Sequence, residues 1–144
     1  MTGKHFYVGM NYHDGGAAIA RSLIKRLEQE TGDRCTSRWP YSKSHVLQGI
    51  RASIALTDML DLAQADYVIL VPLTGTARGV HVEMGAAYGL DKPVYLFRPD
   101  GLEGTAFDAF CLPMPTPWLN AIETEMALHR MRNQPPEDDP ASLP

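Results

Sequence analysis

Glu83 stands where a carboxylate could do chemistry. It lies near the start of a helix predicted over residues 79–90, and the unpaired backbone N–H groups of a helix N-terminus favour a negative charge. We therefore expect Glu83 to stay ionised, as a nucleophile at an anomeric sugar carbon must be. Ala86 and Ala87 follow at the spacing of a helical ion pair and offer no partner. The alternative, an ordinary acid that complements the helix dipole, stays open from this stretch alone.

Asp58 is the second candidate because it interrupts an apolar helical stripe. The stripe repeats every four residues and consists of Ile50, Ile54, Asp58 and Leu62. A carboxylate on such a face is unfavourable unless it is paired or used, whereas Asp61 is expected on the polar side of the same helix. If Asp58 and Glu83 share a cleft, they could act as general acid and nucleophile. Alternatively, Asp58 lies at the edge of the stripe and reaches water or caps a loop.

Two polar loops supply candidate ligand-binding residues. Tyr7 and Gly9 end the first predicted strand, and the glycine-bearing loop after them could cradle a sugar or a phosphate. This loop contains Asn11, Asp14 and Gly15. A plain turn with Asp14 as a helix cap is the alternative, and the absence of G-x-G-x-x-G disfavours a dinucleotide. The second loop and the end of the strand beyond it add Thr76, Arg78, Gly79 and Arg98. Trp39 and Tyr41 could stack on a base or pack in the core or rim.

Strands and helices alternate along the chain. Strands are predicted at residues 6–9, 34–39, 67–71 and 93–97, with a candidate edge strand at 110–114. Helices are predicted at residues 17–30, 45–65, 79–90 and 118–131. The uninterrupted apolar run at 67–71 is typical of a strand buried on both faces of a parallel sheet. We expect a doubly wound, Rossmann- or flavodoxin-like α/β fold: a mostly parallel sheet of about five strands with helices on both faces, and a ligand at the strands' carboxyl ends.

Length and charge narrow the class of protein further. The 144 residues suit one domain, expected over residues 1–132, with a proline-rich and acidic tail at 133–144 expected to be disordered. A formal net charge of -4 without a basic face argues against a nucleic-acid polymer as partner. There is no C-x-x-C pair and no H-x-x-x-H spacing, so we expect no metal. No signal peptide or membrane span is evident, and a cytoplasmic protein is expected.

The central part of the chain resembles the nucleoside 2-deoxyribosyltransferase family, which includes the 2'-deoxynucleoside 5'-phosphate N-glycosidases. The similar pattern is an A-D pair before an apolar strand, a loop, G-x-x-x-E-x-G-x-A and then K-P-V. Here it is formed by Ala65-Asp66, the strand at 67–71, residues 79–87 and Lys92-Pro93-Val94. The opening strand and Phe97-Arg98-Pro99 are similar too, so the resemblance covers about residues 5–100. A departure is Ala77, where the family often has an aspartate or serine; Thr76 or Arg78 could substitute.

The resemblance implies roles for three residues. The glutamate of E-x-G is the family's nucleophile, which corresponds to Glu83, and the assisting aspartate of the preceding helix corresponds to Asp58. The expected reaction is a double displacement: Glu83 attacks C1', Asp58 helps the base depart and Tyr7 orients Glu83. Another base then accepts the sugar (transfer), or water does (hydrolysis).

The resemblance also implies a small-molecule nucleoside or nucleotide as partner, no cofactor, and a homo-oligomer of two or more copies. We expect a transferase-like enzyme. A nucleoside 5'-monophosphate N-glycosidase, which is a hydrolase, is the first alternative. A nucleotide-binding sensor that has lost the chemistry is the second.

Overall fold

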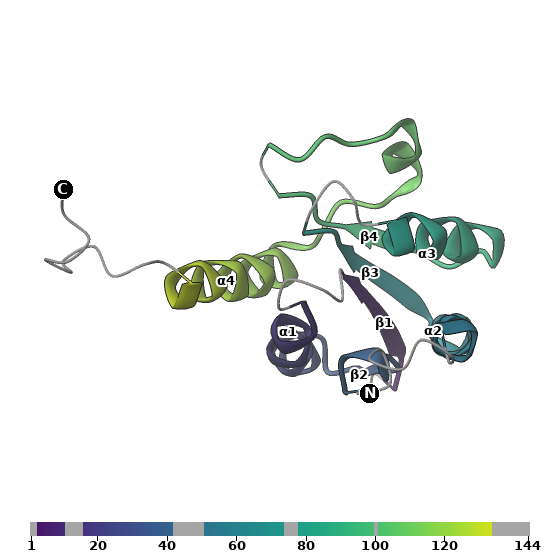
Figure 1. Ribbon diagram of the computed structural model, residues 1–144, viewed down its shortest axis with the longest axis horizontal. Helices are drawn as coiled ribbons and strands as arrows, with labels where there is room; N and C mark the ends of the chain where they lie inside the picture. Colours follow the sequence, from purple (N-terminus) through teal and green to yellow (C-terminus); the bar gives the residue numbers. More distant parts are fainter. Residues whose placement is uncertain (1–2, 11–15, 42–50, 74–77, 100, 134–144) are drawn as a thin grey trace, which may run out of the picture.

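The computed structural model describes residues 3–10, 16–41, 51–73, 78–99 and 101–133 (Figure 1). They form an α/β fold around a parallel sheet whose four strands are ordered β2-β1-β3-β4. The strands are β1 (His5–Met10), β2 (Arg34–Cys35), β3 (Tyr67–Val71) and β4 (Val94–Leu96). The helices are α1 (Gly16–Thr31), α2 (Arg51–Gln64), α3 (Arg78–Gly89) and α4 (Thr116–Asn133), with short 3-10 helices η1 (Trp39–Tyr41) and η4 (Ala106–Phe110).

Helices cover both faces of the sheet. Helices α1 and α4 pack together on one side, and α2 and α3 pack together on the other (Figure 1). The predicted α/β class is confirmed, with four strands in the described part of the chain rather than about five. All five residues of β3 are buried, as its continuous apolar run predicts.

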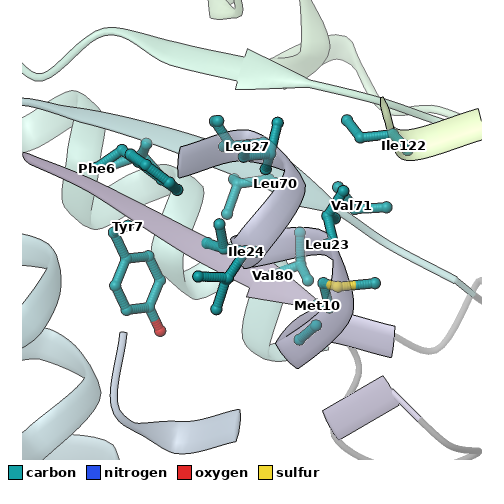
Figure 2. Packing of buried hydrophobic residues seen from close by; sticks show 14 of the residues in the cluster. Phe6, Tyr7, Met10, Leu23, Ile24, Leu27, Leu70, Val71, Val80 and Ile122 are labelled. Atoms are coloured by element: carbon teal, nitrogen blue, oxygen red, sulfur yellow. The ribbon is translucent and has the colours of Figure 1, made fainter. Parts of the chain in front are cut away.

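The alternation of side chains along β1 decides what each helical layer contacts. Phe6 stacks on Tyr67, and Tyr67 stacks in turn on Trp118 of α4, so this side of the sheet faces α1 and α4. Tyr7 points to the opposite side of β1 (Figure 2). Gly9 shares that side with Tyr7, and both therefore face the layer of α2 and α3.

The second strand is shorter than predicted because side chains, and not its backbone, make the hydrogen bonds to the edge of β1 beyond Cys35. Only Arg34 and Cys35 form β2, although residues 34–39 were expected to be extended. Beyond them, the backbone N–H of Val8 donates to Ser37 Oγ (2.8 Å), and the Ser37 hydroxyl donates to the Val8 carbonyl (3.0 Å). The indole Nε1–H of Trp39 donates to the same carbonyl at 2.8 Å. The edge of β1 is therefore satisfied without further strand pairing.

The predicted edge strand at residues 110–114 is wrong. A single bridge between Tyr95 and Leu112 extends the sheet there, and the Leu112 N–H donates to the Val94 carbonyl at 2.7 Å. Pro113 and Pro115 follow the bridge and have no N–H to continue a ladder. The chain instead turns through η4 before it enters α4.

The helices agree with their predicted positions where the structure describes them. Residues 45–50 of the helix predicted at 45–65 and residues 134–144 of the expected tail lie outside the described residues. Gly32 ends α1 in the left-handed conformation (φ 72°), and Asp91 follows α3 in the same conformation (φ 56°). None of the described helices is both long enough and apolar enough to cross a bilayer.

Candidate active site

Glu83 lies at the topological switch point of the sheet, between the neighbouring strands β1 and β3. It belongs to the second turn of α3, is only 8% exposed, and packs on Gly9 near the carboxyl end of β1. A Cβ atom at Gly9 would overlap Glu83 Oε2 and would stand 2.7 Å from Cδ2 of Leu70. Gly9 and Leu70 are paired neighbours in β1 and β3. Glu83 therefore occupies the switch point of the sheet, where open α/β folds bind ligands.

Burial governs the ionisation of Glu83. Desolvation raises its pKa to about 8; the neighbouring Tyr7 hydroxyl opposes this rise and the Asp58 carboxylate adds to it. The expectation that the helix N-terminus keeps Glu83 ionised is therefore wrong for the free protein. Glu83 stands beyond the first turn, where the helix dipole is weak, and the loss of hydration outweighs it.

Tyr7 adds a buried hydroxyl beside this carboxyl. Its side chain is fully buried, and burial followed by the charges of Glu83 and Asp58 raises its pKa far above the ordinary value. Tyr7 therefore remains a hydrogen-bond donor at all physiological pH values. Neither the Tyr7 hydroxyl nor Glu83 Oε2 has a partner within hydrogen-bond geometry in the part of the chain that the structure describes. Two such buried atoms have unused capacity for a ligand.

Asp58 joins the same group from α2. It is half-buried, and its pKa is raised to about 6, first by burial and then by the Asp61 carboxylate, while Arg38 lowers it. Because Asp58 also raises the pKa values of Glu83 and Tyr7, its charge acts at the same place. The structure thus brings together the three residues that the sequence analysis assigned to chemistry.

Asp61 does not lie on a polar, solvent-facing side as predicted. It is 2% exposed and pairs with Arg38, whose Nη2 lies 2.7 Å from Asp61 Oδ1. The segment between β2 and η1 covers this flank of α2, which the periodicity of the helix alone could not show. The available signal was the position of Asp61, three residues after Asp58 and hence on a neighbouring part of the helix surface.

The predicted ligand-binding residues fall into three groups. Five of the residues lie outside the part of the chain that the structure describes: Asn11, Asp14, Gly15, Thr76 and Ala77, the position that departs from the family pattern. Arg78 and Gly79 are exposed at the start of α3, and a Cβ on Gly79 would stand 3.8 Å from Glu83 Oε1. Arg98 is paired: its Nε and Nη2 each lie 2.9 Å from an oxygen of Asp108, which ties the chain after β4 to η4.

The two aromatic candidates differ in their surroundings. Trp39 is 6% exposed and belongs to the hydrophobic core, so it has no free face for a base. Tyr41 is 57% exposed. Among the described residues, no group of three or more histidine, cysteine, aspartate or glutamate side chains is placed to hold a metal ion.

Comparisons with known proteins add evidence on the fold. No protein-family model matches the chain, and no curated protein matches it either. Among solved structures, the chain is similar to the solution structure of BlsM, with a TM-score of 0.56 and 18% sequence identity. The similarity covers 95% of this chain and 97% of BlsM. At this identity the likeness supports the overall arrangement of helices and strands and carries no information on activity.

Proposed function

We propose that this protein cleaves the N-glycosidic bond of a nucleoside, deoxynucleoside or their 5'-monophosphates through a covalent glycosyl-Glu83 intermediate. The observation that carries the proposal is the convergence of buried Glu83 with Tyr7 and Asp58 above Gly9, at the switch point of the sheet. The similarity of residues 65–94 to the nucleoside 2-deoxyribosyltransferases supports the same assignment. By that similarity we also propose a cytoplasmic homo-oligomer that takes part in nucleotide salvage.

The first step is a displacement at the sugar. A Glu83 carboxylate oxygen forms a bond to C1' while the bond from C1' to the base nitrogen breaks, and the electron pair leaves with the base. Asp58 delivers a proton to the departing base, directly or through water. The neighbouring Tyr7 hydroxyl orients Glu83 by donating a hydrogen bond to its carboxylate once the substrate is bound. In the second step a new base or a water molecule forms a bond to C1', the bond from C1' to Glu83 breaks with its electron pair on the carboxylate, and the ionised Asp58 accepts the proton of the attacking group.

The protonation states of Glu83 and Asp58 suit a site that becomes active only when the substrate binds. In the free protein, the pKa of about 8 leaves Glu83 largely protonated near neutral pH, and the pKa of about 6 leaves Asp58 largely ionised. The reaction needs the opposite arrangement. Positive charge that develops on the sugar ring favours the Glu83 carboxylate, so the single shared proton passes to Asp58 in the reacting complex.

The test is intact mass spectrometry after incubation with a 2'-fluoro-2'-deoxynucleoside, whose fluorine slows release of the sugar. We expect a fluorosugar adduct that maps to Glu83 and is absent from Glu83→Gln. A second incubation, of a deoxynucleoside with and without another free base, separates base exchange from hydrolysis. Ligand binding without turnover, or turnover that survives in Glu83→Gln, would remove the proposed mechanism and favour a sensor or a different nucleophile.

The pH dependence of stability is the control for folding. The pKa of Glu83 is near 4.5 when unfolded and about 8 when folded, so the folded state retains a proton that the unfolded state loses between these values. The free energy of unfolding of the wild type then falls by about 1.4 kcal/mol per pH unit over this window from this group. Glu83→Gln has no such loss and should equal or exceed the wild type at pH 8 in urea unfolding. A variant destabilised at every pH would mark Glu83 as structural.

A further inference from the structure

An ion pair beside the site is more tightly built than a surface contact needs to be. The Arg38 guanidinium lies 2.7 Å (Nη2) and 2.9 Å (Nε) from Asp61 Oδ1, and Nε lies 3.1 Å from Oδ2. The backbone N–H of Arg38 also donates to Oδ2, at 3.0 Å. One residue thus holds both oxygens of the carboxylate, which fixes its orientation as well as its place.

Asp61 also attaches α2 to the edge of the sheet, through its backbone carbonyl. The Thr36 hydroxyl lies 2.8 Å from the Asp61 backbone carbonyl and 3.3 Å from that of Phe6, and the Thr36 N–H donates to Phe6 at 2.8 Å. Asp61 is therefore tied to the segment after β2, and this segment is tied to β1. Asp58 lies three residues earlier on α2, so the position of its carboxyl depends on this attachment.

The two charges of the Arg38–Asp61 ion pair differ in their exposure to water. The Asp61 side chain is 3% exposed, whereas the Arg38 side chain is 64% exposed, so water screens the positive end much more than the negative end. The charged groups that shift Asp58 are Asp61 of α2 itself and Arg38. Asp58 in turn raises the pKa values of Glu83 of α3 and Tyr7 of β1, the titratable groups of the packed elements in the same site. Asp61 raises the pKa of Asp58 and Arg38 lowers it, with Asp61 the larger of the two.

Stability alone is a weak reason for such an arrangement. The buried Asp61 carboxylate must recover the hydration that it loses, and apolar replacements of buried ionic groups are often as stable. A negative charge that sits next to a proposed proton donor does have an effect that an apolar side chain would lack, because it discourages a second negative charge nearby.

We propose that Asp61, held by Arg38, is a positioning residue for the reaction: it sets the place of the Asp58 carboxyl and favours the protonated form of Asp58 in the reacting complex. This inference rests on the proposed function. Asp61 acts on the reaction through Asp58 and is not placed at the reacting atoms; its charge also adds a smaller contribution to the raised pKa of Tyr7.

The first test is the pH profile of kcat/KM in Asp61→Asn. Without the neighbouring charge, the pKa of Asp58 should fall by roughly one unit, and the acid limb of the profile should move down with it. The reacting state, with its proton on Asp58, becomes rarer, so kcat/KM at pH 7 should fall roughly tenfold while the alkaline limb stays. A merely structural residue would lower activity at every pH without moving a limb.

Arg38→Gln provides a second variant with the opposite sign. It keeps the backbone N–H that holds Asp61 but removes the cation that lowers the pKa of Asp58, so the acid limb should move up. Asp91→Asn is the matched control, since Asp91 is exposed after α3 and asparagine tolerates its left-handed conformation. Its profile should equal that of the wild type.

Carbon-13 NMR titration of the Asp58 carboxyl measures the same effect without substrate. We expect its pKa to fall in Asp61→Asn, to rise in Arg38→Gln and to stay unchanged in Asp91→Asn. Unchanged titration in the first two folded variants would overturn the inference. Shifts of the expected sign in a protein that turns over no nucleoside would instead mean that the coupling is real and the proposed function is wrong.

Discussion

At the scale of single residues, Gly9 determines how closely Glu83 can approach the sheet. Its missing side chain leaves the space that the carboxyl occupies, and the neighbouring Leu70 closes the other side. This close contact contributes to the burial of Glu83, and burial is the largest cause of its raised pKa. A glycine at the end of a strand can thus tune the chemistry of an acid far along the chain.

Gly9→Ala should therefore damage both stability and activity. The added methyl group meets Glu83 and Leu70, and overpacking of this kind costs roughly 1–3 kcal/mol. Urea unfolding and kcat/KM measure the two effects. Gly85→Ala is the matched control: its Cβ meets nothing within 4 Å, and it should stabilise α3 by about 0.5–1 kcal/mol. Equal behaviour of the two variants would contradict the tight contact at Gly9.

At the scale of elements, the edge of β1 shows how side chains can stand in for a strand. Ser37 supplies both a donor and an acceptor to Val8, where a longer β2 would have supplied backbone groups. Because Ser37 takes the place of strand pairing, the chain can turn at η1, and Trp39 enters the core. The turn also places Arg38 against α2. The Arg38–Asp61 ion pair therefore depends on β2 ending early.

Ser37→Ala should cost roughly 1–3 kcal/mol of unfolding free energy, because the buried N–H of Val8 would lose its acceptor. The Val8 carbonyl would keep the bond from Trp39. Thr124→Ala removes a hydroxyl whose bond to Asn120 is exposed, and should change stability by no more than about 0.5 kcal/mol. Denaturant unfolding of both variants checks the difference, and a small effect at Ser37 would mean that the edge of β1 is satisfied in another way.

At the scale of the whole molecule, the site exists because three elements meet. Tyr7 comes from β1, Asp58 from α2 and Glu83 from α3, and the strand order β2-β1-β3-β4 brings them to one end of one face. The charge of Asp58 raises the pKa of Glu83, so the two carboxyls form a coupled pair with pKa values of about 6 and about 8.

The proposed reaction should accordingly show a bell-shaped dependence of kcat/KM on pH, with limbs near 6 and 8 and a maximum near 7. Below the lower value both carboxyls are protonated and the nucleophile is lost. Above the upper value both are ionised and the acid is lost, so only the singly protonated pair reacts. Initial rates across pH 5–9 measure the profile, and a rate that rises steadily through pH 9 would show that no carboxyl acid takes part.

The amino-acid sequence by itself determined the alternation of strands and helices, the buried central strand Tyr67–Val71, and the two acids Glu83 and Asp58 as candidates. Each of these depends on local spacing or on a short motif, which a sequence carries directly. It did not determine where the second strand ends, because that depends on Ser37 bonding to a residue of another strand.

Only the tertiary structure decided the state of the charges. The protonation of Glu83, the pairing of Asp61 with Arg38 and that of Arg98 with Asp108 all depend on which segment covers which side chain. Desolvation and ion pairing are properties of the surroundings in space, and residues distant along the chain supply those surroundings. A helical pattern can place an aspartate on one side of its own helix, but it cannot show what packs there.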